Sequence, residues 1–300
     1  MRKSFLFFVI CFSLISWKWK DFSIKMEDSP ELRVETAWVV DTVRQGGLRP
    51  DLVNNSPPLI QEELAVQGNT IDGVKAYNKQ TGKLVWDFNI PSGVVSPLIF
   101  HKGNIYFGGA DGFFYSLQFK SGLLNWKYFN AVENSGAPLI YDNSIYWLAS
   151  NQKVYALDLK GSLLWIYSDS SLSGDFSVRR GAGRPAVYKN NLYVGLQNGS
   201  LIVLNRKTGQ FKWKRSFSQP IIEDLKINKK CLLVPIFNSH LFCLSPFNGK
   251  TVYQLAGGSS VRQGGNRIFI SFLKARFKLL KIESFYGKNS LRQLILFRRL

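Results

Sequence analysis

The sequence predicts an all-β protein, built as a single β-propeller of four-stranded blades. Three observations lead to this prediction: aromatic residues are abundant, turn signals recur at regular intervals, and a tryptophan recurs with them. The 300 residues include 23 Phe, 12 Tyr and 8 Trp, and aromatic side chains favour the pleated, half-buried surface of a strand. Hydrophobic residues make up 45% of the chain, which is enough to build a substantial core.

A phrase of the form Gly-x-x-x-Trp recurs about every forty residues. Trp86, Trp126, Trp165 and Trp213 end four copies at intervals of 40, 39 and 48 residues, and Tyr253 ends a fifth. A second turn signal, of the Asp-Gly or Asn-Gly kind in most copies, stands about ten residues before each glycine. Such pairs are favoured in two-residue hairpins. Four short strands punctuated in this way are typical of a propeller blade.

The repeat gives plain structural roles to three columns of residues. The tryptophans are expected to cap each blade against its neighbour, and the glycines before them to supply tight turns: Gly82, Gly122, Gly161 and Gly209. A column of mostly small side chains is expected where the blade is crowded: Ala76, Ser116, Ala156, Val203 and Cys243. We expect no catalysis from any tryptophan.

Residues 31–300 are predicted to form the propeller, with six blades, or seven if residues 21–55 contain further strands. Residues 33–41 resemble a lone fourth strand. An N-terminal strand that completes the last blade would close the ring and remove an exposed edge. The segment Leu291–Leu300 competes for the same place.

Residues 1–20 resemble a signal peptide or a short N-terminal anchor. Met1-Arg2-Lys3 precedes an apolar stretch within Ser4–Ser16, which is the pattern of an export signal. The segment Trp17–Lys20 offers no small-x-small cleavage site, so soluble, anchored and lipidated forms remain open. The expected location is the periplasm or the cell envelope.

Positive charge is concentrated in the second half of the chain. Residues 176–300 contain 23 Lys and Arg against three Asp and Glu, so this half accounts for all of the chain's net charge of +19. An excess of this size favours an anionic partner, and for an exported chain an anionic lipid surface is the expected one. General solubility is the alternative explanation. Basic and aromatic residues also interleave in Phe269–Phe285, but export makes nucleic acid an unlikely partner.

The cysteines and histidines predict neither a metal site nor a cofactor. Cys231 and Cys243 follow the N-terminal segment, and His101 and His240 are the two histidines, too few and too scattered for a His/Cys metal centre. A disulfide between the two cysteines is possible in an oxidising compartment, and the sequence leaves it open.

The phrases resemble the PQQ-like repeat family, whose repeats follow a pattern close to D-G-x-V-x-A-L-x-x-x-T-G-x-x-x-W. The segments Asp72–Tyr77 and Thr81–Trp86 match it almost throughout. Within the family, residues 179–213 resemble a blade of the BamB scaffolds, which assist the assembly of outer-membrane β-barrels. The resemblance implies an Arg-Gly loop that contacts the partner, at Arg180-Gly181 with Arg179 and Arg184 beside it. The acidic loop of those scaffolds has no counterpart at Ser216–Gln219, which contain no carboxylate.

These features predict a non-catalytic, monomeric scaffold that binds a protein of the cell envelope, and the resemblance implies the β-barrel assembly machinery as that partner. The enzyme alternative is a quinoprotein dehydrogenase, which the same family includes. That resemblance implies a pair of adjacent cysteines, which this chain lacks. A propeller that binds anionic membranes or nucleic acid is a further alternative. No phosphate-binding loop, nucleophile elbow or HExxH motif occurs in the sequence.

Overall fold

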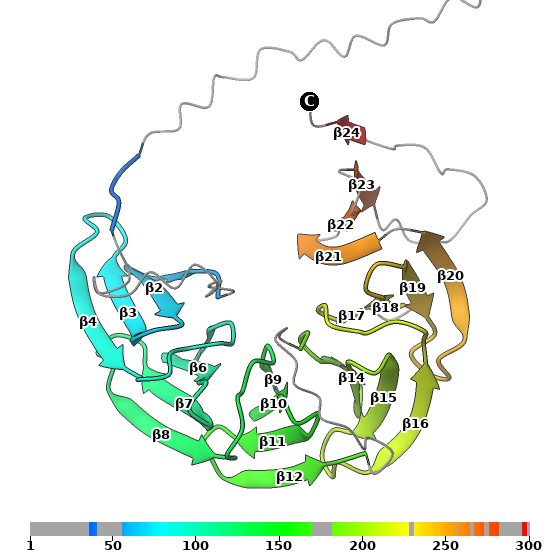
Figure 1. Ribbon diagram of the computed structural model, residues 1–300, viewed down its shortest axis with the longest axis horizontal. Helices are drawn as coiled ribbons and strands as arrows, with labels where there is room; N and C mark the ends of the chain where they lie inside the picture. The colour runs from blue at the N-terminus through cyan, green and yellow to red at the C-terminus, as the bar shows by residue number, and fades with distance from the viewer. Residues whose placement is uncertain are drawn as a thin grey trace, which may run out of the picture. The chain divides into compact units, whose positions relative to one another are not determined.

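The computed structural model describes residues 36–40, 56–169, 182–227 and 231–256 in full. It also describes the backbone of strands within residues 258–298. The chain divides into two units, Met1–Ala37 and Trp38–Leu300, and every strand belongs to the second (Figure 1). Each element of the described part is a β-strand, so the all-β prediction is confirmed. The described residues contain no helix with the length and apolarity to cross a membrane, and the predicted signal segment lies outside them.

The strands form six antiparallel sheets, each of four strands that pair in chain order. The first and second sheets contain β1 (Leu59–Gln61), β2 (Leu64–Asn69), β3 (Gly73–Asn78), β4 (Leu84–Asn89), β5 (Ile99–His101), β6 (Asn104–Gly108), β7 (Phe113–Gln118) and β8 (Leu124–Phe129). The third and fourth contain β9 (Leu139–Tyr141), β10 (Ser144–Leu148), β11 (Val154–Asp158), β12 (Leu163–Tyr167), β13 (Ala186–Tyr188), β14 (Asn191–Gly195), β15 (Ser200–Asn205) and β16 (Phe211–Ser216). The fifth and sixth contain β17 (Lys226–Ile227), β18 (Leu232–Pro235), β19 (His240–Leu244), β20 (Thr251–Ala256), β21 (Gly258–Gly264), β22 (Arg267–Phe272), β23 (Arg276–Lys281) and β24 (Leu296–Arg298).

The turn between the third and fourth strands has the same hydrogen bonding in the first, second, fourth and fifth sheets. In the third sheet it is one residue shorter, and the Asp158 amide donates to the Ser162 carbonyl at 2.9 Å. In the first sheet the Asn78 amide donates to the Lys83 carbonyl at 2.8 Å, and the Gly82 amide donates back to Asn78. The turn between the second and third strands differs from the predicted two-residue hairpin. In the first sheet it contains three residues, and the Asn69 side chain accepts the amides of Ile71 and Asp72. A short polar side chain therefore replaces part of the backbone turn.

The predicted columns of tryptophan and small residues pair across the third and fourth strands. Ala76 lies opposite Trp86, and Ser116 lies opposite Trp126. Each of these rings rests on the turn glycine of the next sheet: a Cβ at Gly122 would lie 2.6 Å from the Trp86 ring. The indole N–H of Trp86 donates to the Phe119 carbonyl of that sheet at 3.1 Å. Neighbouring sheets are thus joined by one repeated contact, as expected for tryptophans that pack each blade against the next.

The fourth strand of the sixth sheet is β24, rather than the predicted segment 33–41. Residues 36–40 form no strand. The apolar C-terminal segment therefore occupies the place for which the two ends of the chain compete. Trp38 nevertheless repeats the tryptophan contact: its ring lies against Gly82, and its indole N–H donates to the Lys79 carbonyl at 2.9 Å.

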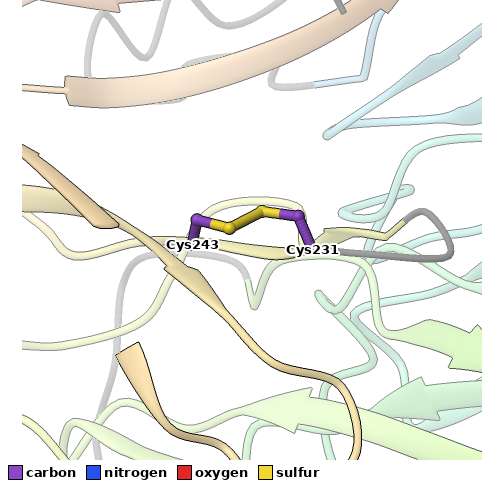
Figure 2. The surroundings of a disulfide bond; sticks show 2 residues. All are labelled: Cys231 and Cys243. Carbon is purple, nitrogen blue, oxygen red and sulfur yellow. A yellow bond between two sulfur atoms is a disulfide. The ribbon is translucent and has the colours of Figure 1, made fainter. Parts of the chain in front are cut away.

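A disulfide, which the sequence leaves open, joins Cys231 to Cys243 (Figure 2). Their Cα atoms are 5.4 Å apart, and twelve positions separate them in the sequence. Both side chains are buried in a small cluster with Leu233 and Leu241. Cys243 thus combines the predicted role of a small core residue with that of a covalent link inside the fifth sheet.

Candidate protein-binding site

Three of the four residues predicted to contact a partner, Arg179, Arg180 and Gly181, lie outside the described residues. Arg184 is described and lies just before β13. The first strands of neighbouring sheets face one another, since β13 contacts β17, whereas the fourth strands follow the outer edge of the array (Figure 1). Arg184 therefore lies on the inner side of the fourth sheet.

The backbone of Arg184 is held by the connection that leads into the fifth sheet. Its amide donates to the Asp224 carboxylate at 2.9 Å, and its carbonyl accepts the Leu225 amide at 3.0 Å. Asp224 also lies 3.5 Å from the Lys226 ammonium group. The position of Arg184 is thus fixed by contacts that do not involve its own guanidinium group.

The residues before Arg184 make equally close contacts. A Cβ on Gly183 would lie 2.0 Å from the Glu223 carbonyl oxygen, so a glycine is required where the two connections touch. The Ala182 carbonyl accepts the Ala137 amide, at 3.1 Å, from the connection before β9. The stretch Ala182–Arg184 with Glu223–Leu225, here called the inner segment, therefore joins three successive sheets.

The Arg184 side chain has an unused donor. Its Nε atom is buried and has no hydrogen-bond acceptor among the described residues, whereas the residue as a whole is half-buried. A buried donor without a partner costs about 1–3 kcal/mol. Guanidinium groups bind carboxylates strongly and with defined geometry. The arrangement is suited to receiving a carboxylate or carbonyl oxygen from a bound protein.

Two acidic residues, Glu223 and Asp224, follow the segment Ser216–Gln219. These two lie in the same connection, a few residues further along, and the structure places both beside the Gly183–Arg184 backbone. A signal was present, because they are two of only three carboxylates in residues 176–300. Charged groups of both signs therefore meet in the inner segment.

No metal-binding group emerges from the described part of the chain. Within it, no three His, Cys, Asp or Glu side chains lie close enough together to hold an ion. The chemistry of the inner segment is that of hydrogen bonding and charge pairing.

Comparison with protein families gives a match to the model described as outer membrane protein assembly factor BamB, over residues 35–135 and 72–271. The chain belongs to this family. A BamB of Moranella endobia is 26% identical over 213 residues, covering 66% of this chain and 54% of that protein. A BamB of Legionella pneumophila is 25% identical over 203 residues, covering 64% and 50%. The chain thus spans about half the length of these relatives.

Shorter matches involve enzymes of the quinoprotein type. The quinohemoprotein alcohol dehydrogenase ADH-IIG of Pseudomonas putida is 34% identical over 99 residues, which cover 30% of this chain and 13% of the enzyme. A match of that extent covers roughly two blades of the repeat.

Solved structures confirm the propeller fold. The crystal structure of BamB from Moraxella catarrhalis superimposes with a TM-score of 0.63 at 15% identity, covering 76% of this chain and 72% of that one. The designed protein Ika8 gives a TM-score of 0.62 at 18% identity, covering 76% and 70%. At these identities the comparison establishes the fold alone.

Proposed function

We propose that this protein is a non-catalytic scaffold of the cell envelope that binds another protein during outer-membrane protein assembly, through its inner segment. The proposal is supported by membership of the BamB family and by the relatives named as assembly factors. One observation about the chain itself carries the site: Arg184 is held by backbone contacts, while its Nε atom has no acceptor among the residues that the structure describes. Loops held on a rigid scaffold are where binding residues concentrate.

The proposed mechanism is recognition without chemical change. The sheets fix the inner segment, and the Arg184 guanidinium receives an acidic or carbonyl group of the partner. Arg184 is half-buried, so a pair with a carboxylate of the partner would be partly shielded from water, and it would be stronger than that of a fully solvated surface arginine. The expected partner is a component of the β-barrel assembly machinery, and the expected location is the periplasmic side of the outer membrane.

The test is a pull-down of envelope proteins with the full chain and with Arg184→Glu. We expect the variant to lose at least about tenfold in partner recovery, because a buried charged contact is worth 2 kcal/mol or more. Arg184→Ala removes the guanidinium group without adding a carboxylate beside Asp224; it should also lose recovery while its melting temperature changes little, since the backbone atoms of residue 184 make the contacts seen here. Lys127→Glu, the same change of charge at an exposed position of β8, is the matched control and should bind normally.

Two outcomes would contradict the proposal. Equal recovery by Arg184→Glu and the native protein would remove the site, and cross-linking that yields no assembly component would remove the function. Quinone-dependent dye reduction by the purified protein would favour the dehydrogenase alternative, for which the partial enzyme matches are the supporting observation.

A further inference from the structure

The two ends of the sheets carry opposite charge. The first and third turns of an antiparallel meander lie at one end of the sheet, and the second turn and the connections between sheets lie at the other. The first end, here called the lysine end, comprises residues 62–63, 79–83, 102–103, 119–123, 142–143, 159–162, 189–190, 206–210 and 245–250. These turns contain nine Lys and Arg against three carboxylates.

The opposite end has the reverse balance. It comprises residues 70–72, 90–98, 109–112, 130–138, 149–153, 168–169, 182–185, 196–199, 217–225 and 236–239. These residues contain six carboxylates against two cations, Lys153 and Arg184. Among the loops that the structure describes, positive charge therefore gathers at the lysine end, in both halves of the chain.

Lysine recurs at the lysine end in each of the first five sheets. Each of the five described turns between third and fourth strands carries an exposed lysine: Lys79, Lys120, Lys160, Lys207 and Lys250. The three carboxylates at this end pair with Lys79, Lys120 and Arg206, at 3.5, 3.5 and 2.7 Å. Six lysines have no carboxylate partner among the described residues: Lys83, Lys102, Lys160, Lys189, Lys207 and Lys250.

Exposed aliphatic and aromatic side chains stand next to these lysines. Leu84, Leu124, Leu163 and Phe211 each follow the turn glycine by two positions and are 54, 44, 46 and 47% exposed. Val252 in the fifth sheet is 60% exposed. All five lie at the start of fourth strands, which are the outermost strands of their sheets. Lysine and exposed apolar groups thus alternate along one rim of the molecule.

We propose that the lysine end docks on an anionic phospholipid surface. Lysine ammonium groups spread over five sheets match a broad layer of negative headgroups, and exposed apolar side chains beside them can enter the boundary between headgroups and acyl chains. A single-stranded nucleic acid would need rings for base stacking. Exposed rings at these positions are Phe211 and Phe247, whereas the other exposed apolar side chains there are aliphatic: Leu84, Leu123, Leu124, Leu163 and Val252. The inference does not rest on the proposed function, which uses the inner segment.

The test is co-sedimentation of the full chain with vesicles of phosphatidylglycerol and phosphatidylethanolamine, with phosphatidylcholine vesicles for comparison. We expect binding to the anionic vesicles that weakens as salt increases. The double variant Lys160→Glu/Lys207→Glu should lower the partition coefficient at least about tenfold. The control Lys127→Glu/Lys153→Glu makes the same change of charge away from the lysine end, and should lower it less than about twofold.

Lys153 and Lys160 flank the same strand, β11, so they compare the two ends within one sheet. Equal losses in both double variants would show that net charge alone drives binding and would overturn the proposal. So would absence of vesicle binding by the native protein, or tighter binding of an oligonucleotide or an envelope protein through Lys160 and Lys207. Leu124→Ser/Leu163→Ser should reduce the binding that remains at high salt, and no reduction would overturn the role of the apolar groups.

Discussion

The outer contacts between sheets and the inner segment follow different rules. On the outside, Trp38, Trp86, Trp126 and Trp165 each lie against a turn glycine of the following sheet and donate an indole hydrogen bond to a carbonyl nearby, at 2.9 to 3.1 Å. On the inside, successive connections are joined by backbone bonds, from the Ala137 amide to the Ala182 carbonyl and from the Leu225 amide to the Arg184 carbonyl. The second of these contacts adds a side-chain bond that departs from the repeat, from the Arg184 amide to the Asp224 carboxylate.

We therefore expect the repeated tryptophan contact to contribute to stability and the inner segment to contribute to binding. A contact that recurs in each sheet holds the array together and fits any propeller of this type. A contact that departs from the repeat, and that leaves a buried donor without an acceptor, is not explained by stability. The predictions below test that separation, beginning with the largest expected effect.

Replacing a tryptophan of the outer contact should destabilise the protein most. Trp165→Ala removes a ring that is 8% exposed and its hydrogen bond to the Arg206 carbonyl, so we expect the free energy of unfolding to fall by about 3–5 kcal/mol. Trp213 is less buried and meets Gly249 with the far edge of its ring. Trp213→Ala should therefore cost less in urea denaturation, and equal costs would contradict the account of the contact.

Reduction of the disulfide should rank second. A cross-link between residues twelve positions apart lowers the conformational entropy of the unfolded chain. In the loop-entropy model this raises the free energy of unfolding by about 3 kcal/mol. Urea denaturation with and without reductant measures the difference. The variant Cys231→Ala/Cys243→Ala should be insensitive to reductant, and a reductant effect that persists in it would refute the assignment.

Replacing Arg206 and replacing Arg184 should have different effects on stability, because only Arg206 holds the fold together with its side chain. The Arg206 side chain is 11% exposed, pairs with Asp142 at 2.7 Å and donates to the Lys189 carbonyl at 3.2 Å, so Arg206→Ala should cost about 1–2 kcal/mol. The Arg184 Nε atom has no acceptor within the described ranges, so Arg184→Ala should cost less than about 0.5 kcal/mol. Thermal unfolding of both variants makes the comparison, and the reverse order would contradict it.

The smallest effect concerns alkaline pH. Burial raises the pKa of Tyr106 and Tyr193 above 10.0, and burial together with Asp111 raises the pKa of Tyr115 further. The unfolded chain therefore loses these protons first, and stability should fall as the pH rises above about 10. Phenolate absorbance in native and urea-unfolded protein measures the shift. Coincident titration curves would show that these rings are accessible to water.

The fold was predictable because the repeat carries it. Gly-x-x-x-Trp and the second turn signal locate the strands of the first five sheets, and the pairing of Ala76 with Trp86 follows from the same register. The closing strand was not predictable, because residues 33–41 and Leu291–Leu300 both have suitable patterns, and tertiary pairing decides between such segments. The disulfide was undetermined for a similar reason, since spacing alone does not show that two cysteines lie within 5.4 Å.

The candidate site was predictable only in part. The resemblance to a family indicated Arg184, but the carboxylates beside it are forty residues away in the sequence, and the sheet packing brings them together. The charge separation between the two ends was hidden for another reason. Net charge along the chain emphasises residues 176–300, whereas the lysines of the lysine end come from both halves.

The most direct test of the central claim is photo-cross-linking in intact cells, with a photoreactive amino acid placed at position 184 and, in a second strain, at position 160. If the inner segment binds an envelope partner, position 184 should yield a defined adduct with an outer-membrane assembly protein, and position 160 should not yield that adduct. The same adduct from both positions, or from neither, would contradict the claim that the inner segment is the binding site.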